Sequence, residues 1–160
     1  MSARAQALAQ RFEQANAELA NLIESCSDSQ WRAVCQGEQW SVGVTAHHIA
    51  YDQAHIVEWF QAIAAGLPQP PPAEGGLDAA TARHAAQFAD CSREETLALL
   101  RRDGELAAGA VRALTDEQLD RMSLPTADGR PPRTAGQVVE RILIGHVLGH
   151  GASIRAAIAG

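Results

Sequence analysis

The sequence predicts an all-α protein, a four-helix bundle with long crossover loops and short accessory helices. Three observations predict this class. Apolar residues make up 46% of the chain but aromatic residues only 4%, so small aliphatic side chains must fill the core. Alanine-rich segments interrupted by Gln, Glu and Arg favour helix by intrinsic propensity. β-branched residues never alternate over a long stretch, so we expect no strand.

The first two long helices are predicted from periodicity and from a cap. Residues 3–25 carry apolar side chains at helical spacing, namely Leu8, Phe12, Ala15, Leu19, Leu22 and Ile23. The second helix spans residues 41–66 and begins at Ser41, whose hydroxyl suits an N-cap. Its core-facing positions are expected to be Val42, Thr45, Ile49, Ile56, Phe60 and Ile63.

Four S/T-x-x-E/Q boxes mark the remaining helix starts, because the hydroxyl and the later Glu or Gln each bond a free backbone N–H. The boxes are Ser27/Gln30, Ser92/Glu95, Thr115/Gln118 and Thr134/Gln137. The second and fourth open long helices over residues 92–114 and 134–158, whereas the other two open short helices over 27–34 and 115–122.

Two loops separate the later helices. The prolines of residues 66–76 lack the N–H that a helix needs, so this segment is a crossover loop. A short helix at 78–89 follows it, and residues 123–133 form a second loop. The four long helices, of about 20–26 residues each, match the length of a bundle. The long connections indicate a topology other than the simplest up-down-up-down order.

Bulk properties exclude several classes of protein. At 160 residues the chain suits one domain, residues 1–160. The net charge is −6 and the arginines are scattered, so we expect no nucleic-acid partner. No uninterrupted apolar run reaches the length that spans a bilayer, and the first residues lack the apolar stretch of a signal peptide. The three cysteines have no CxxC spacing. We therefore expect a cytoplasmic protein with reduced cysteines and no membrane partner.

Two histidines on the last helix predict a metal site. His146 and His150 lie four residues apart on an otherwise apolar stripe, so their imidazoles project from the same side. Two imidazoles in this geometry can share one metal ion. The alternative is a pair of histidines near solvent. Burying an unpaired polar group costs about 1–3 kcal/mol, which favours a compensating third ligand.

The second helix offers candidates for that ligand. His48 and Asp52 lie four residues apart at one edge of the apolar stripe, and periodicity favours His48 over His47 without deciding between them. His55 is either an outer group near the metal or a solvated histidine at the mouth of the bundle. His84 is expected to be solvated, because its short helix is polar.

Two segments resemble the DinB-like superfamily, including thiol-dependent maleylpyruvate isomerase N-terminal domains. They are Trp40 to His48 (WSVGVTAHH) and Thr134 to His150 (TAGQVVERILIGHVLGH), and the resemblance extends over essentially the whole chain. It implies a bundle that binds one divalent metal near one end. The ligands that it implies are His48, His146 and His150, with His47 leaving a one-residue ambiguity. It also implies a homodimer and a low-molecular-weight thiol such as mycothiol or bacillithiol.

Three imidazoles leave a coordination position open, which is typical of catalytic sites. Zinc is the expected metal, although nickel, iron and manganese also suit these ligands. Such an ion can deprotonate a thiol or activate water. Together with this chemistry, the resemblance implies a metal-dependent S-transferase, isomerase or hydrolase acting on a small molecule. The alternative is a non-catalytic bundle that binds metal or a small ligand, for example in a stress response.

Three further residues have predicted roles at this site. Asp52 is interpreted as an acceptor that orients an imidazole, a fourth ligand, a proton acceptor or simply a solvated charge. Arg130 and Arg133, in the loop before the last helix, either clamp a substrate carboxylate bidentately or are solvated.

Overall fold

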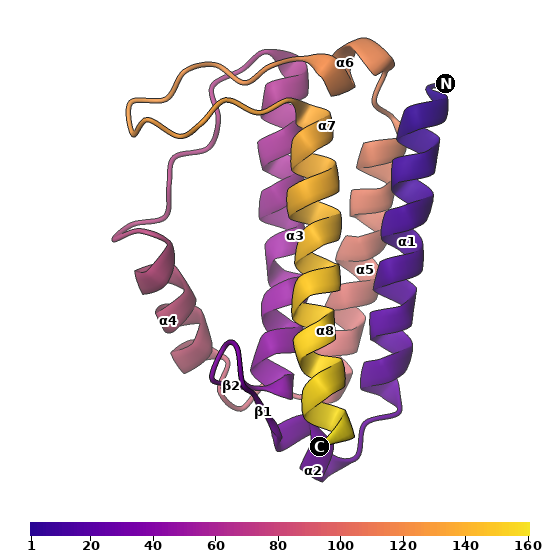
Figure 1. Cartoon of the computed structure of the whole chain (residues 1–160), viewed down its shortest axis with the longest axis vertical. Coiled ribbons are helices and arrows are strands. Elements are labelled where there is room, and N and C mark those ends of the chain that lie inside the picture. Colours follow the sequence, from indigo (N-terminus) through magenta and orange to yellow (C-terminus); the bar gives the residue numbers. More distant parts are fainter.

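The computed structural model describes residues 1–160, and its long helices form a four-helix bundle (Figure 1). The first three long helices are α1 (Ala3–Glu24), α3 (Val42–Ala65) and α5 (Arg93–Arg112). The fourth is continuous from α7 (Ala135–Gln137) through a π-helical segment, η1 (Val138–Ile144), to α8 (Gly145–Ala159). The short helices are α2 (Asp28–Arg32), α4 (Leu77–Gln87) and α6 (Asp116–Asp120). Every predicted helix is present, and each end lies within two residues of its prediction.

Side-chain caps begin the helices where the sequence predicted them. Full reciprocal boxes form at Ser27, Thr115 and Thr134. At the remaining box, the Ser92 hydroxyl accepts from the backbone N–H of Glu95 at 3.1 Å, but the return bond is absent. Ser41 likewise accepts from the N–H of Val44 at 3.1 Å and caps α3.

A small β-hairpin precedes α3, so the expectation of no strand was wrong. Strands β1 (Val34–Cys35) and β2 (Trp40–Ser41) pair antiparallel, with Val34 opposite Ser41. Each strand has two residues, which is too short for an alternating pattern to appear in the sequence. The hairpin ends at Ser41, so it leads directly into α3, and its first strand contacts α8.

The long helices do not alternate in direction. In Figure 1, α1 and α8 run downward, whereas α3 and α5 both run upward. The crossover that permits this contains the proline-rich loop and α4, which lies outside the bundle beside α3 (Figure 1). α5 packs against both α1 and α3, and α3 also packs against α8. The bundle therefore departs from the simple up-down-up-down order, as the long connections indicated.

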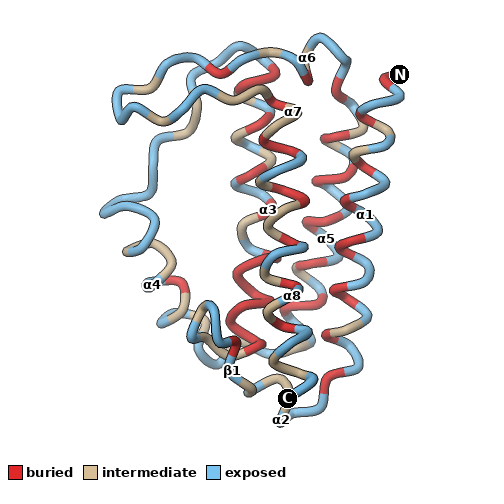
Figure 2. Tube along the Cα trace, in the orientation of Figure 1, coloured by how far each residue is buried: buried red, intermediate tan, exposed pale blue.

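The core lies between the four long helices. Buried residues follow their inward faces (Figure 2). All six α3 positions predicted to face the core are buried, namely Val42, Thr45, Ile49, Ile56, Phe60 and Ile63. Many other core residues are alanines, so the helix backbones can approach closely.

The last helix is long and apolar enough, by length and composition alone, to cross a membrane. Core helices of bundles often meet the same criterion, and this helix buries Val138, Val139 and Leu143 in the core. Charged residues at 140, 141 and 155 interrupt its apolar sequence, which is why no uninterrupted span was expected.

Candidate metal centre

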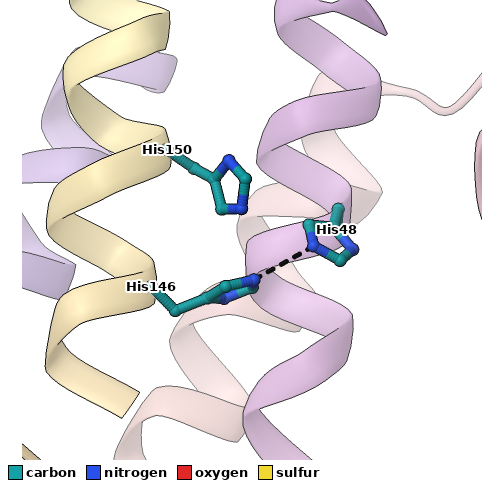
Figure 3. Close-up of side chains that lie close together, drawn as sticks. All are labelled: His48, His146 and His150. Atoms are coloured by element: carbon teal, nitrogen blue, oxygen red, sulfur yellow. Dashed lines mark hydrogen bonds between the residues drawn. The ribbon is translucent and has the colours of Figure 1, made fainter. Parts of the chain in front are cut away.

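Three histidines from opposite parts of the chain converge inside the bundle (Figure 3). His48 projects from α3, and His146 and His150 project from successive turns of α8. One ring nitrogen from each lies within 4.8 Å of the other two. The Nε2 atoms of His48 and His146 are 3.0 Å apart. The structure therefore brings together the three residues that the family resemblance implied as ligands.

The helix that carries two of these histidines is widened just before them. The backbone N–H of Gly145 donates to the carbonyl of Glu140, five residues earlier, which is a π-helical bond. π-helical segments are rare in proteins, and many of those that occur lie at functional sites. Here the π-helical segment ends at Ile144, two residues before His146, so it sets the rotation of α8 that presents both imidazoles to α3.

The hydrogen-bonding pattern fits a bound cation. If His146 donates from Nε2 to His48, its Nδ1 becomes a bare acceptor, and that atom is buried without a partner. A divalent ion would instead accept the Nε2 lone pairs of both rings. Two nitrogens bound to one tetrahedral zinc lie about 3.3 Å apart, close to the observed separation. The three side chains therefore fit a divalent metal.

Two of the three imidazoles are held in the form that can bind a metal. Burial and, to a smaller extent, the neighbouring His150 lower the pKa of His48 to about 4. Burial also lowers the pKa of His146 to about 3, with contributions from His48 and His150. Both rings are therefore neutral at pH 7, with a lone pair available for coordination.

Asp52 lies where the ring nitrogens of His48 and His146 converge. Its Oδ2 is 3.5 Å from Nε2 of His48 and 3.7 Å from Nε2 of His146. Burial raises the pKa of Asp52 to about 6. A carboxylate that orients an imidazole would bind the opposite ring nitrogen. The placement therefore fits a fourth ligand or a proton acceptor.

A cavity of about 670 Å³ opens directly onto this cluster. His48 and Asp52 form part of its wall, together with three residues farther along α3, Tyr51, His55 and Trp59. Residues of α4, prolines 70–72 and Arg130 line the opposite side. The volume lies within the range of small-molecule sites, so the cluster faces a space that can hold a substrate.

Comparison with known proteins identifies the family. The family model described as the DinB superfamily matches residues 11–154. The chain belongs to the DinB superfamily. No curated protein matches the sequence.

Two solved structures share the DinB-superfamily fold of this chain. YfiT from Bacillus subtilis, described as a probable metal-dependent hydrolase with an unusual four-helix bundle topology, is 21% identical with a TM-score of 0.78. The alignment covers 98% of this chain and 87% of YfiT. The mycothiol-dependent maleylpyruvate isomerase is 13% identical with a TM-score of 0.73, and the alignment covers 94% of this chain. This chain spans only 60% of that isomerase.

One carboxylate of this DinB-superfamily site was not predicted from the sequence. Glu38, in the turn of the hairpin, bonds Nδ1 of His150 through its Oε1 at 2.6 Å. Burial raises the pKa of Glu38, but the hydrogen bond from His150 lowers it, and the net effect is a pKa below the usual value. No local pattern marks this residue, because only the packing of the hairpin on α8 places it beside His150.

His84 is buried, and the prediction that it is solvated was wrong. It is 7% exposed, and its Nε2 is 3.2 Å from Nδ1 of His47. The short helix α4 folds back so that this side chain packs on α3, a contact that its polar sequence does not indicate. His47 thus faces His84 and lies outside the group formed by His48, His146 and His150. His55 is exposed at the cavity wall.

The two loop arginines have different surroundings. Arg130 lines the cavity, where its guanidinium donates to the carbonyl of Pro70 at 3.0 Å and pairs with Asp128 at 2.9 Å. It therefore joins the two long loops, and its role as a substrate clamp stays a prediction. Arg133 is not among the residues lining the cavity, and its backbone N–H donates to the Ser123 hydroxyl at 3.1 Å.

Proposed function

We propose that this protein is a metal-dependent enzyme that acts on a small molecule, with one divalent ion held by His48, His146 and His150. The observation that carries the proposal is the cavity, because it opens onto His48 and Asp52. A structural zinc site is closed by four protein ligands, whereas a catalytic site keeps a position for water or substrate. Zinc is the expected ion, and nickel, iron and manganese are the alternatives.

The ion would lower the pKa of a bound thiol or water, so that the bound group can lose its proton at neutral pH. Asp52 stands beside the converging nitrogens, where its carboxylate would be placed to accept a proton from a bound thiol or water. The walls formed by α3, α4 and the two loops would hold the substrate against this centre. The open cavity disfavours the alternative of a sealed, non-catalytic bundle.

We further propose a thiol-dependent reaction, with mycothiol or bacillithiol as the co-substrate of an S-transferase, isomerase or hydrolase. The shared fold with a mycothiol-dependent maleylpyruvate isomerase and with YfiT supports this class. We also propose a cytoplasmic homodimer that binds neither nucleic acid nor membrane. The net charge of −6 and the scattered arginines support the absence of a nucleic-acid partner.

Metal analysis tests the proposed centre. Purified parent protein loaded with zinc should retain about one ion per chain after desalting, as a site with three histidine ligands predicts. His146→Ala should lose stoichiometric zinc, because two imidazoles remain. The control is His55→Ala, which removes an exposed histidine of the same cavity and should retain zinc. An unchanged metal-to-protein ratio in His146→Ala would refute the assigned ligands.

Thermal shift measurements with mycothiol, bacillithiol and glutathione test the thiol. A thiol that binds the zinc-loaded native protein should raise its melting temperature. If the protein binds zinc but no thiol shifts its melting temperature, a metal-activated water becomes the better proposal.

A further inference from the structure

The two α8 histidines differ at the nitrogen that faces away from the other ligands. Nδ1 of His150 is 2.6 Å from Oε1 of Glu38. Nδ1 of His146, one turn earlier on the same helix, is buried without a partner. One ligand ring is therefore held by a carboxylate and the other is not.

We propose that Glu38 is a positioning residue that accepts a hydrogen bond from Nδ1–H of His150 and thereby keeps Nε2 of His150 free for the metal. A neutral imidazole carries one proton, so a proton held on Nδ1 leaves the lone pair on Nε2. A carboxylate partner also fixes the ring orientation and makes the ligand more basic. The inference rests on the metal centre of the proposed function and adds a residue to it.

The turn of the hairpin fixes the position of Glu38. The next residue, Gln39, has φ of 60°, a left-handed conformation that is uncommon outside glycine. Its backbone N–H donates to the carbonyl of Cys35 at 2.8 Å, and its side chain donates to the carbonyl of Gln36 at 2.7 Å. Cys35 is completely buried. The turn is therefore anchored at both ends, and it leads directly into the helix that carries His48.

Glu38 brings a buried negative charge next to the three histidines. Its side chain is 12% exposed, and Oε2 is buried with no partner that meets hydrogen-bond geometry. A buried polar atom without a partner costs free energy. A negative charge at this position would offset part of the charge of a divalent ion bound by three neutral imidazoles.

Two variants separate the hydrogen bond from the charge. Glu38→Gln keeps an acceptor oxygen but removes the charge, and Glu38→Ala removes both. Zinc affinity measured by competition with a chelator should fall about tenfold in Glu38→Gln and up to about 100-fold in Glu38→Ala. Both variants should still take up one ion at saturating zinc. The control is Glu18→Gln, an exposed carboxylate on α1, which should keep the parent affinity.

The tautomer of His150 gives a second readout that does not need metal. In nitrogen-15 NMR spectra of the metal-free parent, His150 should show a protonated Nδ1. Glu38→Ala should shift it toward protonation at Nε2, whereas a merely structural role would leave the tautomer unchanged.

The outcomes distinguish this inference from the proposed function. Parent-like zinc affinity and an unchanged tautomer in a folded Glu38→Ala protein would overturn the role of Glu38 and leave the metal centre intact. If the parent itself fails to bind zinc, the proposed function fails, and the tautomer still decides whether Glu38 positions His150. Should Glu38→Ala not fold, Glu38→Gln carries the affinity measurement alone, because its amide oxygen still accepts from Nδ1–H of His150. Parent-like zinc affinity in Glu38→Gln would then overturn the role of Glu38.

Discussion

At the scale of single residues, the site collects polar groups in places where burial disfavours their charged forms. The pKa of His146 falls to about 3 and that of Asp52 rises to about 6, in both cases chiefly through burial. Each shift is a cost that the folded protein bears when the group is forced to charge. A metal ion would relieve this cost, because neutral imidazoles and a nearby carboxylate are suitable ligands for it.

Asp52→Asn should therefore stabilise the metal-free protein. The folded pKa of about 6 lies above the ordinary value of 3.8, so ionised Asp52 destabilises the folded state fully above pH 6 and not at all below pH 3.8. At pH 8 with a chelator present, urea unfolding should show a gain of about 1–3 kcal/mol, and the gain should shrink at pH 5. Glu58→Gln, an exposed carboxylate on the same helix, should change stability by less than about 0.5 kcal/mol. A pH-independent loss of stability in Asp52→Asn would contradict the assigned cause.

At the scale of elements, a buried polar network fixes how α1 packs on α5. The Asn16 amide donates to the carbonyl of Leu100 at 3.1 Å and accepts from Gln53 at 2.7 Å. Gly104 leaves room for this amide, because a Cβ there would lie 2.2 Å from Asn16 Nδ2. The network links α1, α3 and α5, so it sets the position of the helix that carries His48.

Two glycines of α5 should respond oppositely to alanine. Gly104→Ala forces the Asn16 amide away and should destabilise the protein by about 1–3 kcal/mol. A Cβ at Gly109 would meet no atom within 4 Å. Gly109→Ala should therefore stabilise the protein by up to about 1 kcal/mol, through helix propensity alone. Urea unfolding of both variants measures the difference, and equal effects would show that the Asn16 contact does not constrain the packing.

At the scale of the whole molecule, the histidines make the metal-free fold sensitive to acid. Burial lowers the pKa of His48 and His84 to about 4 and that of His146 to about 3. Unfolded histidines protonate near pH 6.5, so these three groups contribute stability that is complete above pH 6.5 and is lost as the pH falls toward 4. Asp52 has the opposite effect on stability, because its raised pKa means that the folded state binds a proton at a higher pH than the unfolded state does.

Near pH 5, His48, His84 and His146 take up about three protons on unfolding and Asp52 releases about one, a net uptake of about two. Burial lowers the pKa of His47 as well, which adds to this uptake. The free energy of unfolding of the metal-free protein should therefore fall by at least about 2.7 kcal/mol per pH unit. Urea unfolding at several pH values between 7.5 and 4.5, with a chelator present, measures this slope. His84→Phe should reduce the slope by the contribution of about one proton taken up on unfolding. A flat profile would show that the buried histidines do not titrate as the structure indicates.

The amino-acid sequence by itself determined the helices, because caps and apolar periodicity act within a few residues. It also determined that His146 and His150 share a side of one helix. Only the tertiary structure decided between His47 and His48, since neighbouring residues on a helix point about 100° apart and the rotation of α3 against α8 selects one of them. Likewise, the hairpin places Glu38 beside His150, and the crossover places His84 beside His47. The two residues of each pair are far apart in the sequence, so no local pattern predicts these contacts.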